Sequence, residues 1–204
     1  MLEARRLECV RGERRIFSEV SFSLYPGHSI EVRGPNGSGK TSLLRVLCGL
    51  LPPASGDVLW RGESIRASRQ AFLSNVTYAG HRAAVKDELT VVENLRVSSA
   101  LSGVRLSVAD ASETLNRVGL GDHCGRLARH LSEGQRRRIA LARLVACRRS
   151  LWLLDEILTS LDQAASHVMR SAIERHLARG GMAVIATHQD LSLAGPTARL
   201  ELVP

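Results

Sequence analysis

The spacing of apolar and polar residues changes along the chain, and near the N-terminus it has the two-residue period of β-strands. Alternating apolar side chains over 20–25 predict a half-buried strand, which Pro26-Gly27 ends as a turn. Residues 3–10 are a second candidate strand. The polar run 11–17 between the two predicts a loop.

Later strands are predicted by short apolar runs without alternation. Such runs, at 151–154 and 182–187, are typical of parallel strands that are buried on both faces of a sheet. Further strands are expected over 29–33, 57–60, 75–79 and 199–203.

Helical spacing of apolar residues fills the remaining segments, and three of these begin with a polar capping signal. Thr90 with Glu93, Ser107 with Asp110, and Ser132 with Gln135 follow the capping-box spacing. We expect helices over 41–51, 90–101, 107–119, 132–147 and 163–178. Strands that alternate with helices predict an α/β fold with a mainly parallel sheet.

One stretch between a predicted strand and a predicted helix carries a strong chemical signal. Residues 34–41 match the phosphate-loop pattern G-x-x-x-x-G-K-[ST] at every fixed position. Glycines there let backbone N–H groups turn toward phosphate oxygens, and the helix N-terminus adds partial positive charge. Lys40 provides a cation for the β- and γ-phosphates, and the Thr41 hydroxyl is placed for Mg²⁺. A glycine-rich turn with a chance lysine is the alternative, which the strand–loop–helix context disfavours.

Three further residues follow predicted buried strands. Asp155 and Glu156 end the first, and His188 ends the second, at the sheet edge where α/β folds bind ligands. One carboxylate can hold Mg²⁺ through water, and the other can activate an attacking water. His188 can donate a hydrogen bond to a γ-phosphate. Without the phosphate loop, a helix-capping acid pair and a loop histidine would be the preferred interpretation.

Composition narrows the class of protein. The chain has 204 residues, 44% of them hydrophobic, and no apolar run reaches the roughly 18 residues that span a bilayer. We expect one soluble domain in a reducing cytosol with four free cysteines. All but two of the 28 basic residues are arginine, and the net charge is +8. Because aromatic residues are only 3%, we expect no nucleic-acid partner; solvated helix faces or a nearby membrane surface explain the charge.

Taken together, these residues resemble the ATP-binding-cassette (ABC) family of ATPases. The discriminating segment is Leu131-Ser132-Glu133-Gly134-Gln135, close to the family signature L-S-G-G-Q. The resemblance covers nearly the whole chain and implies one domain, 1–204. That domain has a mainly parallel core sheet, an N-terminal antiparallel β subdomain and a small helical subdomain over about 82–147.

The resemblance also implies ATP and Mg²⁺ as cofactors and a head-to-tail dimer of two copies when ATP is bound. Glu156 and His188 are the implied catalytic residues, with Thr41 and Asp155 at Mg²⁺, Asp155 through water. Residues 160–162 resemble the dimer-facing aspartate loop. The implied nucleotide contacts are Arg11, Gly34, Pro35, Asn36, Gly37, Ser38, Gly39, Lys40, Thr41, Ser42, Ser132, Gly134 and Gln135.

Three positions depart from the family pattern, and one of them, Ile157 in place of the usual proline after the glutamate, removes no chemistry. His81 stands where a glutamine usually contacts Mg²⁺ and the transport partner, and its role as a metal ligand stays open because imidazole is a poorer Mg²⁺ ligand than an amide oxygen. Arg11 lies near the place of an aromatic residue that stacks on adenine. A guanidinium can also stack, so the adenine contact is kept as a candidate and base selectivity stays open.

Residues near the motifs are similar to those of the ATPases in bacterial cytochrome c maturation (haem exporter) complexes. The segments that show this similarity are 78–81, 88–95, 131–138 and 187–191. This implies an energy-coupling subunit docked on membrane-spanning subunits at the cytoplasmic side of the inner membrane. No direct haem contact is expected, because His123, Cys124 and His130 do not form a convincing haem site. Alternatives are the ATPase of another transporter, for lipids, metals or small molecules, and a soluble cassette protein acting on ribosomes or DNA. A GTPase is disfavoured because the chain lacks N-K-x-D.

Overall fold

The computed structural model describes residues 1–80, 84–157 and 163–203, which form two units. The first unit contains Met1–Tyr78, Arg149–Glu156 and the C-terminal segment from Glu174. The second contains the described residues from Ala79 to Arg148 and from Ile157 to Ile173.

Two sheets build the first unit. The antiparallel sheet has the order β2-β1-β4-β5, and the other sheet has the order β6-β7-β8-β3-β9. In the second sheet, β7 pairs with β8, and β3 pairs with both β8 and β9, all in parallel. The strands are β1 (Leu2–Arg11), β2 (Arg14–Leu24), β3 (Ser29–Arg33), β4 (Ser55–Trp60), β5 (Glu63–Ser64), β6 (Val76–Ala79), β7 (Leu151–Asp155), β8 (Met182–Ala186) and β9 (Thr197–Glu201).

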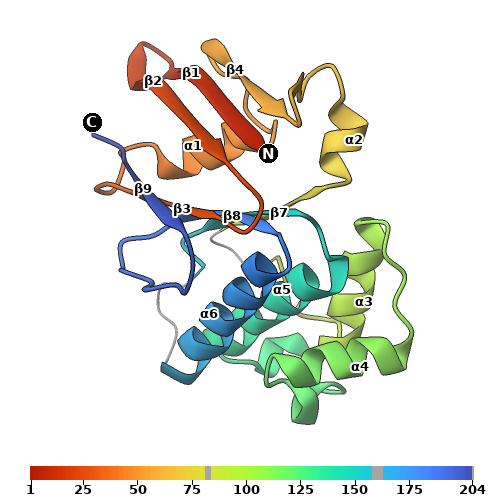
Figure 1. Ribbon diagram of the computed structural model, residues 1–204. Coiled ribbons are helices and arrows are strands. Elements are labelled where there is room, and N and C mark those ends of the chain that lie inside the picture. Colours follow the sequence, from red (N-terminus) through yellow and green to blue (C-terminus); the bar gives the residue numbers. More distant parts are fainter. Residues whose placement is uncertain (81–83, 158–162, 204) are drawn as a thin grey trace. The chain divides into compact units, whose positions relative to one another are not determined.

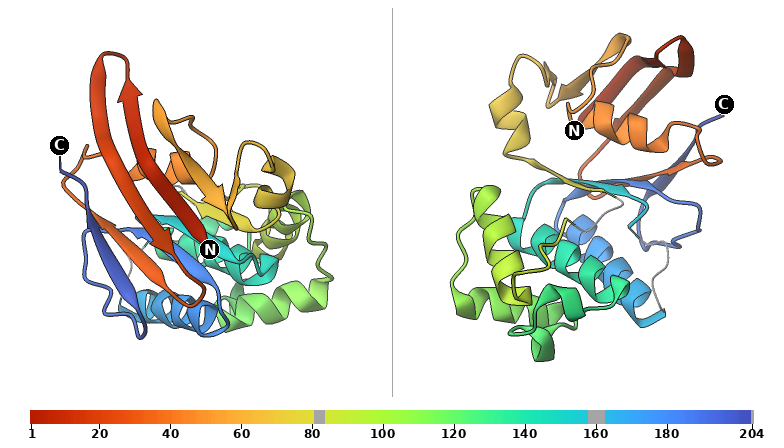
Figure 2. Two further views of the ribbon diagram at one scale, coloured as in Figure 1. Left: turned by 45° about the horizontal axis from the view of Figure 1, so that its top comes forward. Right: turned by 180° about the vertical axis from the view of Figure 1, so that it is seen from behind.

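Helix α1 (Lys40–Leu47) lies between the two sheets of this unit (Figures 1 and 2). Its apolar side chains Leu43, Leu44 and Leu47 are fully buried, and they share one core with side chains of both sheets. Burial of a leucine side chain stabilises a fold by about 2 kcal/mol, so this helix is fixed by its packing. The loop that precedes α1 is fixed with it.

Helices build the second unit. Three of them, α3 (Val91–Leu101), α4 (Val108–Arg117) and α5 (Glu133–Cys147), pack on one another. All three predicted capping boxes are confirmed, because each cap side chain accepts from the N3 backbone and each N3 side chain accepts in return. The remaining helices among the described residues are α2 (Arg69–Leu73), η1 (Gly121–His123), η2 (Ala128–His130) and α6 (Gln163–Ala178).

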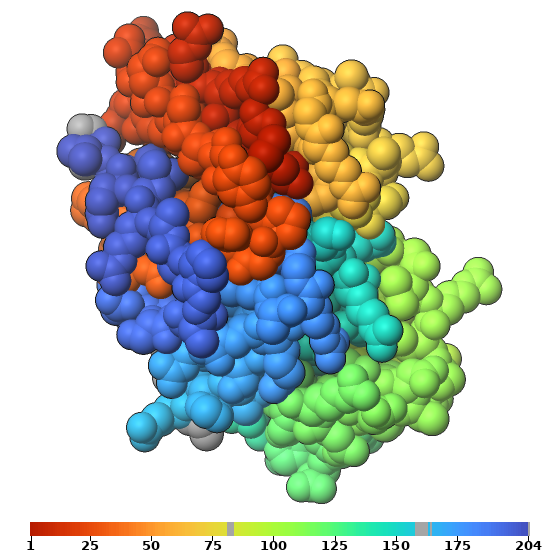
Figure 3. Space-filling view, viewed as in Figure 1, coloured from red at the N-terminus to blue at the C-terminus, as the bar shows by residue number. Residues whose placement is uncertain are grey.

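The predicted α/β fold, with a parallel sheet, an antiparallel N-terminal sheet and a helical part, is confirmed. The predicted loop over 11–17 is wrong: β1 runs to Arg11 and β2 starts at Arg14, with Arg11 opposite Arg14. Because β2 is an edge strand with an exposed side, its polar residues fit a strand as well as a loop. Figure 3 shows this hairpin, red to orange, on the surface beside the yellow-orange β4–α2 segment.

The predicted helix 41–51 is too long, because α1 ends at Leu47. Gly49 has φ 71°, its N–H bonds to Val46 O at 3.0 Å, and the Leu50 N–H bonds to Arg45 O at 2.9 Å. This pair of bonds is the Schellman arrangement, which ends a helix at a left-handed glycine.

Candidate functional site

The phosphate loop connects β3 to α1, as the sequence predicts. Its glycines Gly34, Gly37 and Gly39 have φ values of 145°, 82° and 99°, a range that residues with a side chain rarely adopt. A Cβ built on Gly39 would lie 2.4 Å from Ile16 Cγ2 of strand β2. The loop backbone therefore packs directly against the hairpin and leaves room only for glycine.

Lys40 is turned back over this loop. Its side chain is only 5% exposed, and Nζ donates to the carbonyls of Gly34 at 2.9 Å and Pro35 at 3.1 Å. A buried ammonium needs such acceptors because desolvation without them is costly. The contacts hold the charge over the glycine turn, and successive backbone N–H groups in such a turn can form an anion-binding concavity.

Glu156 and His188 meet Lys40 at the same place. Glu156 Oε1 lies 3.5 Å from Lys40 Nζ and 3.1 Å from His188 Nε2, and His188 Nε2 lies 3.1 Å from Lys40 Nζ. The imidazole Nε2 can accept from the ammonium or donate to the carboxylate, but it cannot do both at once. Three side chains from separate parts of the sequence thus share one set of exchangeable hydrogen bonds.

The backbone at Glu156 supports this placement. Its φ is 53°, which is uncommon for a residue other than glycine, and its N–H donates to Ala186 O at 3.0 Å. Strain of this kind persists where surrounding bonds impose it, and it is concentrated at functional sites. The side chain is 24% exposed, so solvent water can reach the carboxylate.

A second polar group lies at the start of α1. Thr41 Oγ1 donates to Asp155 Oδ1 at 3.0 Å, and Tyr78 OH donates to Asp155 Oδ2 at 2.9 Å. Asp155 is 2% exposed, at the end of β7. Burial, followed by the bond to Asp155, raises the pKa of Tyr78 to about 12, so the phenol stays protonated and remains a donor.

The signature residues form the exposed N-terminus of α5. Ser132 Oγ accepts from Gln135 N at 3.2 Å, Gln135 Oε1 accepts from Ser132 N at 2.9 Å, and Gly134 completes the first turn. Gln135 Nε2 also lies 2.7 Å from His123 Nε2. The helix end carries partial positive charge, and its first N–H groups have no partner within the helix.

The other predicted site residues lie as follows. Ser38 and Ser42 are buried, Pro35 lies in the loop turn beside Asn36, and Arg11 is exposed at the end of β1. His81 and the segment 160–162 lie outside the described residues. In the part of the chain that the structure describes, no three His, Cys, Asp or Glu side chains gather as a metal site.

The prediction missed two residues. Tyr78 was noted only in a likeness to relatives, yet its hydroxyl orients Asp155; its position at the end of a predicted strand was the available signal. Ile16 packs against the phosphate loop, and the available signal was the apolar pair Ile16-Phe17 at the end of an otherwise polar run.

Comparison with known proteins places this geometry in a family. A family model described as "ABC transporter" matches residues 17–159. The chain is 50% identical over 197 residues to the "Cytochrome c biogenesis ATP-binding export protein CcmA" of Nitrosomonas europaea, covering 97% of this chain and 92% of the relative. It is 44% identical to the protein of that name from Pseudomonas aeruginosa over 193 residues, 95% of each chain.

Solved structures share the fold. A putative ABC transporter ATP-binding protein from Pyrococcus furiosus superposes with a TM-score of 0.85 at 24% identity, covering 98% of this chain and 96% of that one. A second, titled a dimeric post-hydrolysis state of an ATP-binding cassette bound to ADP and Pi, has a TM-score of 0.81 at 20% identity, with 93% and 88% covered. Among the described helices of this chain, none combines the length and apolar character needed to cross a bilayer.

Proposed function

The chain belongs to the ABC transporter family and, within it, to the cytochrome c biogenesis ATP-binding export proteins; on that premise we propose that it hydrolyses ATP to drive haem export or delivery. The observation that best supports this proposal is that the side chains of Lys40, Glu156 and His188 meet at the phosphate loop. The whole chain then acts as a single cassette domain with a helical insertion over about 82–147.

The loop fits a nucleotide triphosphate. Ser38 Oγ is buried, with no hydrogen-bond partner among the described residues, and it lies 2.6 Å from where a Cβ on Gly34 would be. An orphaned hydroxyl in a glycine turn suits a phosphate oxygen as its missing partner. Lys40 then neutralises the β- and γ-phosphates, and the backbone amides of residues 37–42 surround them.

The group around Asp155 fits Mg²⁺. A hydroxyl and one carboxylate are hard oxygen donors, and Mg²⁺ usually takes only one or two protein ligands, together with water and substrate phosphates. We assign Thr41 as the direct ligand and Asp155 as a ligand through water, with Tyr78 holding the carboxylate. The ion neutralises charge on the phosphates during hydrolysis.

Glu156 and His188 carry the chemistry. Glu156 orients a water for in-line attack on the γ-phosphorus and accepts its proton. His188 holds a γ-phosphate oxygen with its Nε2 proton, and Lys40 stays on the oxygen that bridges toward the leaving ADP. As the phosphate leaves, Glu156 gives the accepted proton to solvent through its exposed side, and the Nε2 N–H of His188 can again donate to the carboxylate.

A second copy completes the site. The exposed cap of α5 offers Ser132, Gly134 and Gln135 to the γ-phosphate of ATP held by the other copy, head to tail. Arg11 is the candidate contact for adenine, by stacking of its guanidinium. A solved relative of the same fold, titled a dimeric cassette with ADP and Pi, supports pairing of this kind.

The location follows from the same proposal. The chain is peripheral at the cytoplasmic side of the bacterial inner membrane, held by membrane-spanning subunits that carry the transport path. We propose no nucleic-acid partner and no direct haem contact. His81 is the candidate for coupling to those subunits in place of the usual glutamine.

The test is Glu156→Gln in the purified chain. The amide keeps the size of the side chain but cannot accept a proton, so hydrolysis should fall by about 100-fold or more while ATP binding persists. The rate of hydrolysis is measured by phosphate release, and ATP binding is measured by titration with a fluorescent ATP analogue. Gel filtration with ATP should show a dimer for the variant, and normal hydrolysis by the variant would remove Glu156 from the mechanism.

A further inference from the structure

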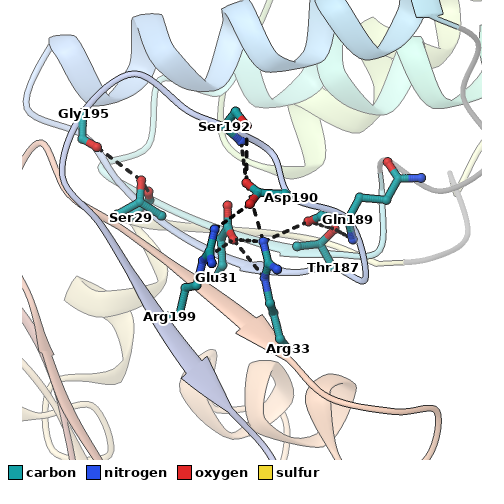
Figure 4. A network of polar contacts seen from close by, with 10 residues as sticks. Ser29, Glu31, Arg33, Thr187, Gln189, Asp190, Ser192, Gly195 and Arg199 are labelled. Atoms are coloured by element: carbon teal, nitrogen blue, oxygen red, sulfur yellow. Dashed lines mark hydrogen bonds and ion pairs between the residues drawn. The ribbon is translucent and has the colours of Figure 1, made fainter.

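Four charged side chains, Glu31, Arg33, Asp190 and Arg199, form a closed ring beside Gln189, the residue that follows His188 in the sequence (Figure 4). Glu31 Oε2 accepts from Arg33 Nη2 at 2.6 Å and Nε at 3.1 Å, and lies 3.8 Å from Arg199 Nε. Asp190 closes the ring: its carboxylate is 2.6 Å from Arg199 Nη2 and 3.7 Å from Arg33 Nη2. Acids and bases alternate, so the ring is neutral as a set.

Strand pairing explains the arrangement. Glu31 and Arg33 lie two residues apart on one face of β3, and Glu31 is directly opposite Arg199 in the parallel register with β9. Glu31 is 2% exposed in the middle of the sheet. A carboxylate buried this deeply requires paired cations, so Arg33 has to remain where it is.

The ring also holds the chain on the far side of His188. Arg33 Nη2 donates to the Gln189 carbonyl at 3.5 Å, and Asp190 accepts from the Ser192 N–H at 3.0 Å. On the near side, the Thr187 N–H donates to Val32 O, and Thr187 Oγ1 accepts from the Gln189 N–H at 3.0 Å. The backbone is therefore fixed immediately before and after His188.

His188 itself has little else to hold it. Its side chain is 39% exposed, and its described contacts are to Lys40 and Glu156, which are proposed to act on the phosphates and on the attacking water. An imidazole must stay within a few tenths of an ångström of its place to keep a hydrogen bond to a phosphate oxygen. That precision has to come from the backbone.

We propose that the ring of Glu31, Arg33, Asp190 and Arg199 is a positioning device that sets His188 against the γ-phosphate, with Arg33 as its central positioning residue. The inference rests on the proposed role of His188 at that phosphate. It predicts that the ring influences how tightly the γ-phosphate is held while having no effect on the diphosphate part of the nucleotide.

The chain provides a matched control. Arg5 binds Glu3 two residues before it with almost the same geometry, Nη2 at 2.8 Å and Nε at 3.1 Å to one carboxylate oxygen, on β1 of the other sheet. Arg33→Gln and Arg5→Gln therefore remove pairs of similar bond geometry, although the Arg5 pair is more exposed, with side-chain exposures of 62% and 14% against 20% and 2% for Arg33 and Glu31. We would measure the affinities of both variants and the wild type for a non-hydrolysable ATP analogue and for ADP.

Arg33→Gln should lower the ratio of analogue to ADP affinity about tenfold, with ADP affinity unchanged, and Arg5→Gln should change neither. In a His188→Ala background, Arg33→Gln should add nothing further, because the device acts only through His188. If Arg33→Gln fails to fold with Glu31 unpaired, Asp190→Asn replaces it, since Glu31 then keeps both arginines.

The possible failures are distinguishable. Three results would show that the positioning role is wrong while the proposed function stands. In Arg33→Gln the affinities for the ATP analogue and for ADP fall together, or the variant behaves like Arg5→Gln, or its effect adds to that of His188→Ala. If the wild type binds neither nucleotide, or His188→Ala leaves the affinity ratio unchanged, the error lies in the proposed site and the inference is lost with it.

Discussion

The hydroxyl of Thr41 donates to the carboxylate of Asp155 at 3.0 Å across 114 positions of sequence. One residue is in the first turn of α1 and the other ends β7, and both elements belong to the first unit. The parallel sheet brings the carboxyl end of β7 to the helix that follows β3. The hydroxyl and the carboxylate that are proposed to hold Mg²⁺ are thus close together in the fold.

Lys40→Ala should weaken nucleotide binding by about 10- to 100-fold, because a charge-assisted hydrogen bond contributes about 1.5–3 kcal/mol. Titration with a fluorescent ATP analogue measures the change. Lys86 is the only other lysine of the chain and is exposed, so Lys86→Ala is the matched control and should bind as the wild type does. Equal affinities for all three proteins would exclude Lys40 from the phosphate site.

Tyr78→Phe should raise the Mg²⁺ concentration for half-maximal ATP hydrolysis by about tenfold, because residues that orient metal ligands typically contribute 10- to 100-fold in affinity. The variant removes only the hydroxyl that donates to Asp155. Tyr25, the second tyrosine of the chain, is half exposed, and Tyr25→Phe should leave the Mg²⁺ requirement unchanged.

The same hydroxyl gives an alkaline signature. Because the pKa of Tyr78 is raised to about 12, its folded state favours the neutral phenol. Its contribution to stability is full below the unfolded value of about 10 and is lost as the pH rises through about 12. A pH titration of phenolate absorbance in the wild type and in Tyr78→Phe should differ by one tyrosine with a pKa near 12. If the pKa of that tyrosine is instead the ordinary value of about 10, the contact with Asp155 is contradicted.

Ser132→Ala and Ser107→Ala should each cost about 1 kcal/mol of stability, because each removes the side-chain acceptor of a capping box. Urea unfolding measures this cost. Only Ser132→Ala should also lower ATP hydrolysis, since only that helix end is proposed to meet a nucleotide. Equal hydrolysis by the two variants would limit Ser132 to a structural role.

His176 should make the fold less stable in mild acid. Burial lowers its pKa, against the backbone hydrogen bonds to Met182 and Ser150 that raise it, and its ring stacks on Trp152 at 4.0 Å. The folded state therefore favours the neutral ring, and stability is complete above the unfolded pKa of about 6.5 and falls as the pH drops below it.

Urea unfolding followed by tryptophan fluorescence should show this decline between about pH 7 and 5, with a slope of at most about 1.4 kcal/mol per pH unit for one proton. His176→Phe keeps a stacked ring and should remove this part of the slope. His167→Gln, on the exposed side of the same helix, should keep it. A slope that survives in His176→Phe would assign it to other groups.

Local signals in the sequence predicted much of the fold. The phosphate loop and the three capping boxes depend on a few neighbouring residues whose chemistry allows one arrangement, so they could be located before any tertiary contact was known. The buried strands β7 and β8 were equally easy to predict from the sequence. Both of their faces are buried, so their apolar residues form an unbroken run.

Contacts between distant strands could not be predicted in this way. The partnership of Glu31 with Arg199 requires the order β8-β3-β9, which no local pattern encodes. The edge strand β2 looked like a loop because Arg14 and Arg15 face solvent. The hydrogen bond of Tyr78 to Asp155 likewise depends on the pairing of β6 with β7.

The cap at Ser132 has a consequence for repeated turnover. Its hydroxyl oxygen accepts from the Gln135 amide, which leaves the hydroxyl hydrogen able to rotate toward an arriving anion. In the proposed dimer, α5 can therefore gain and lose its contact with ATP while its first turn stays wound. Each catalytic cycle then begins from a ready-made helix end, and the work of opening goes into moving the subunits rather than rebuilding secondary structure.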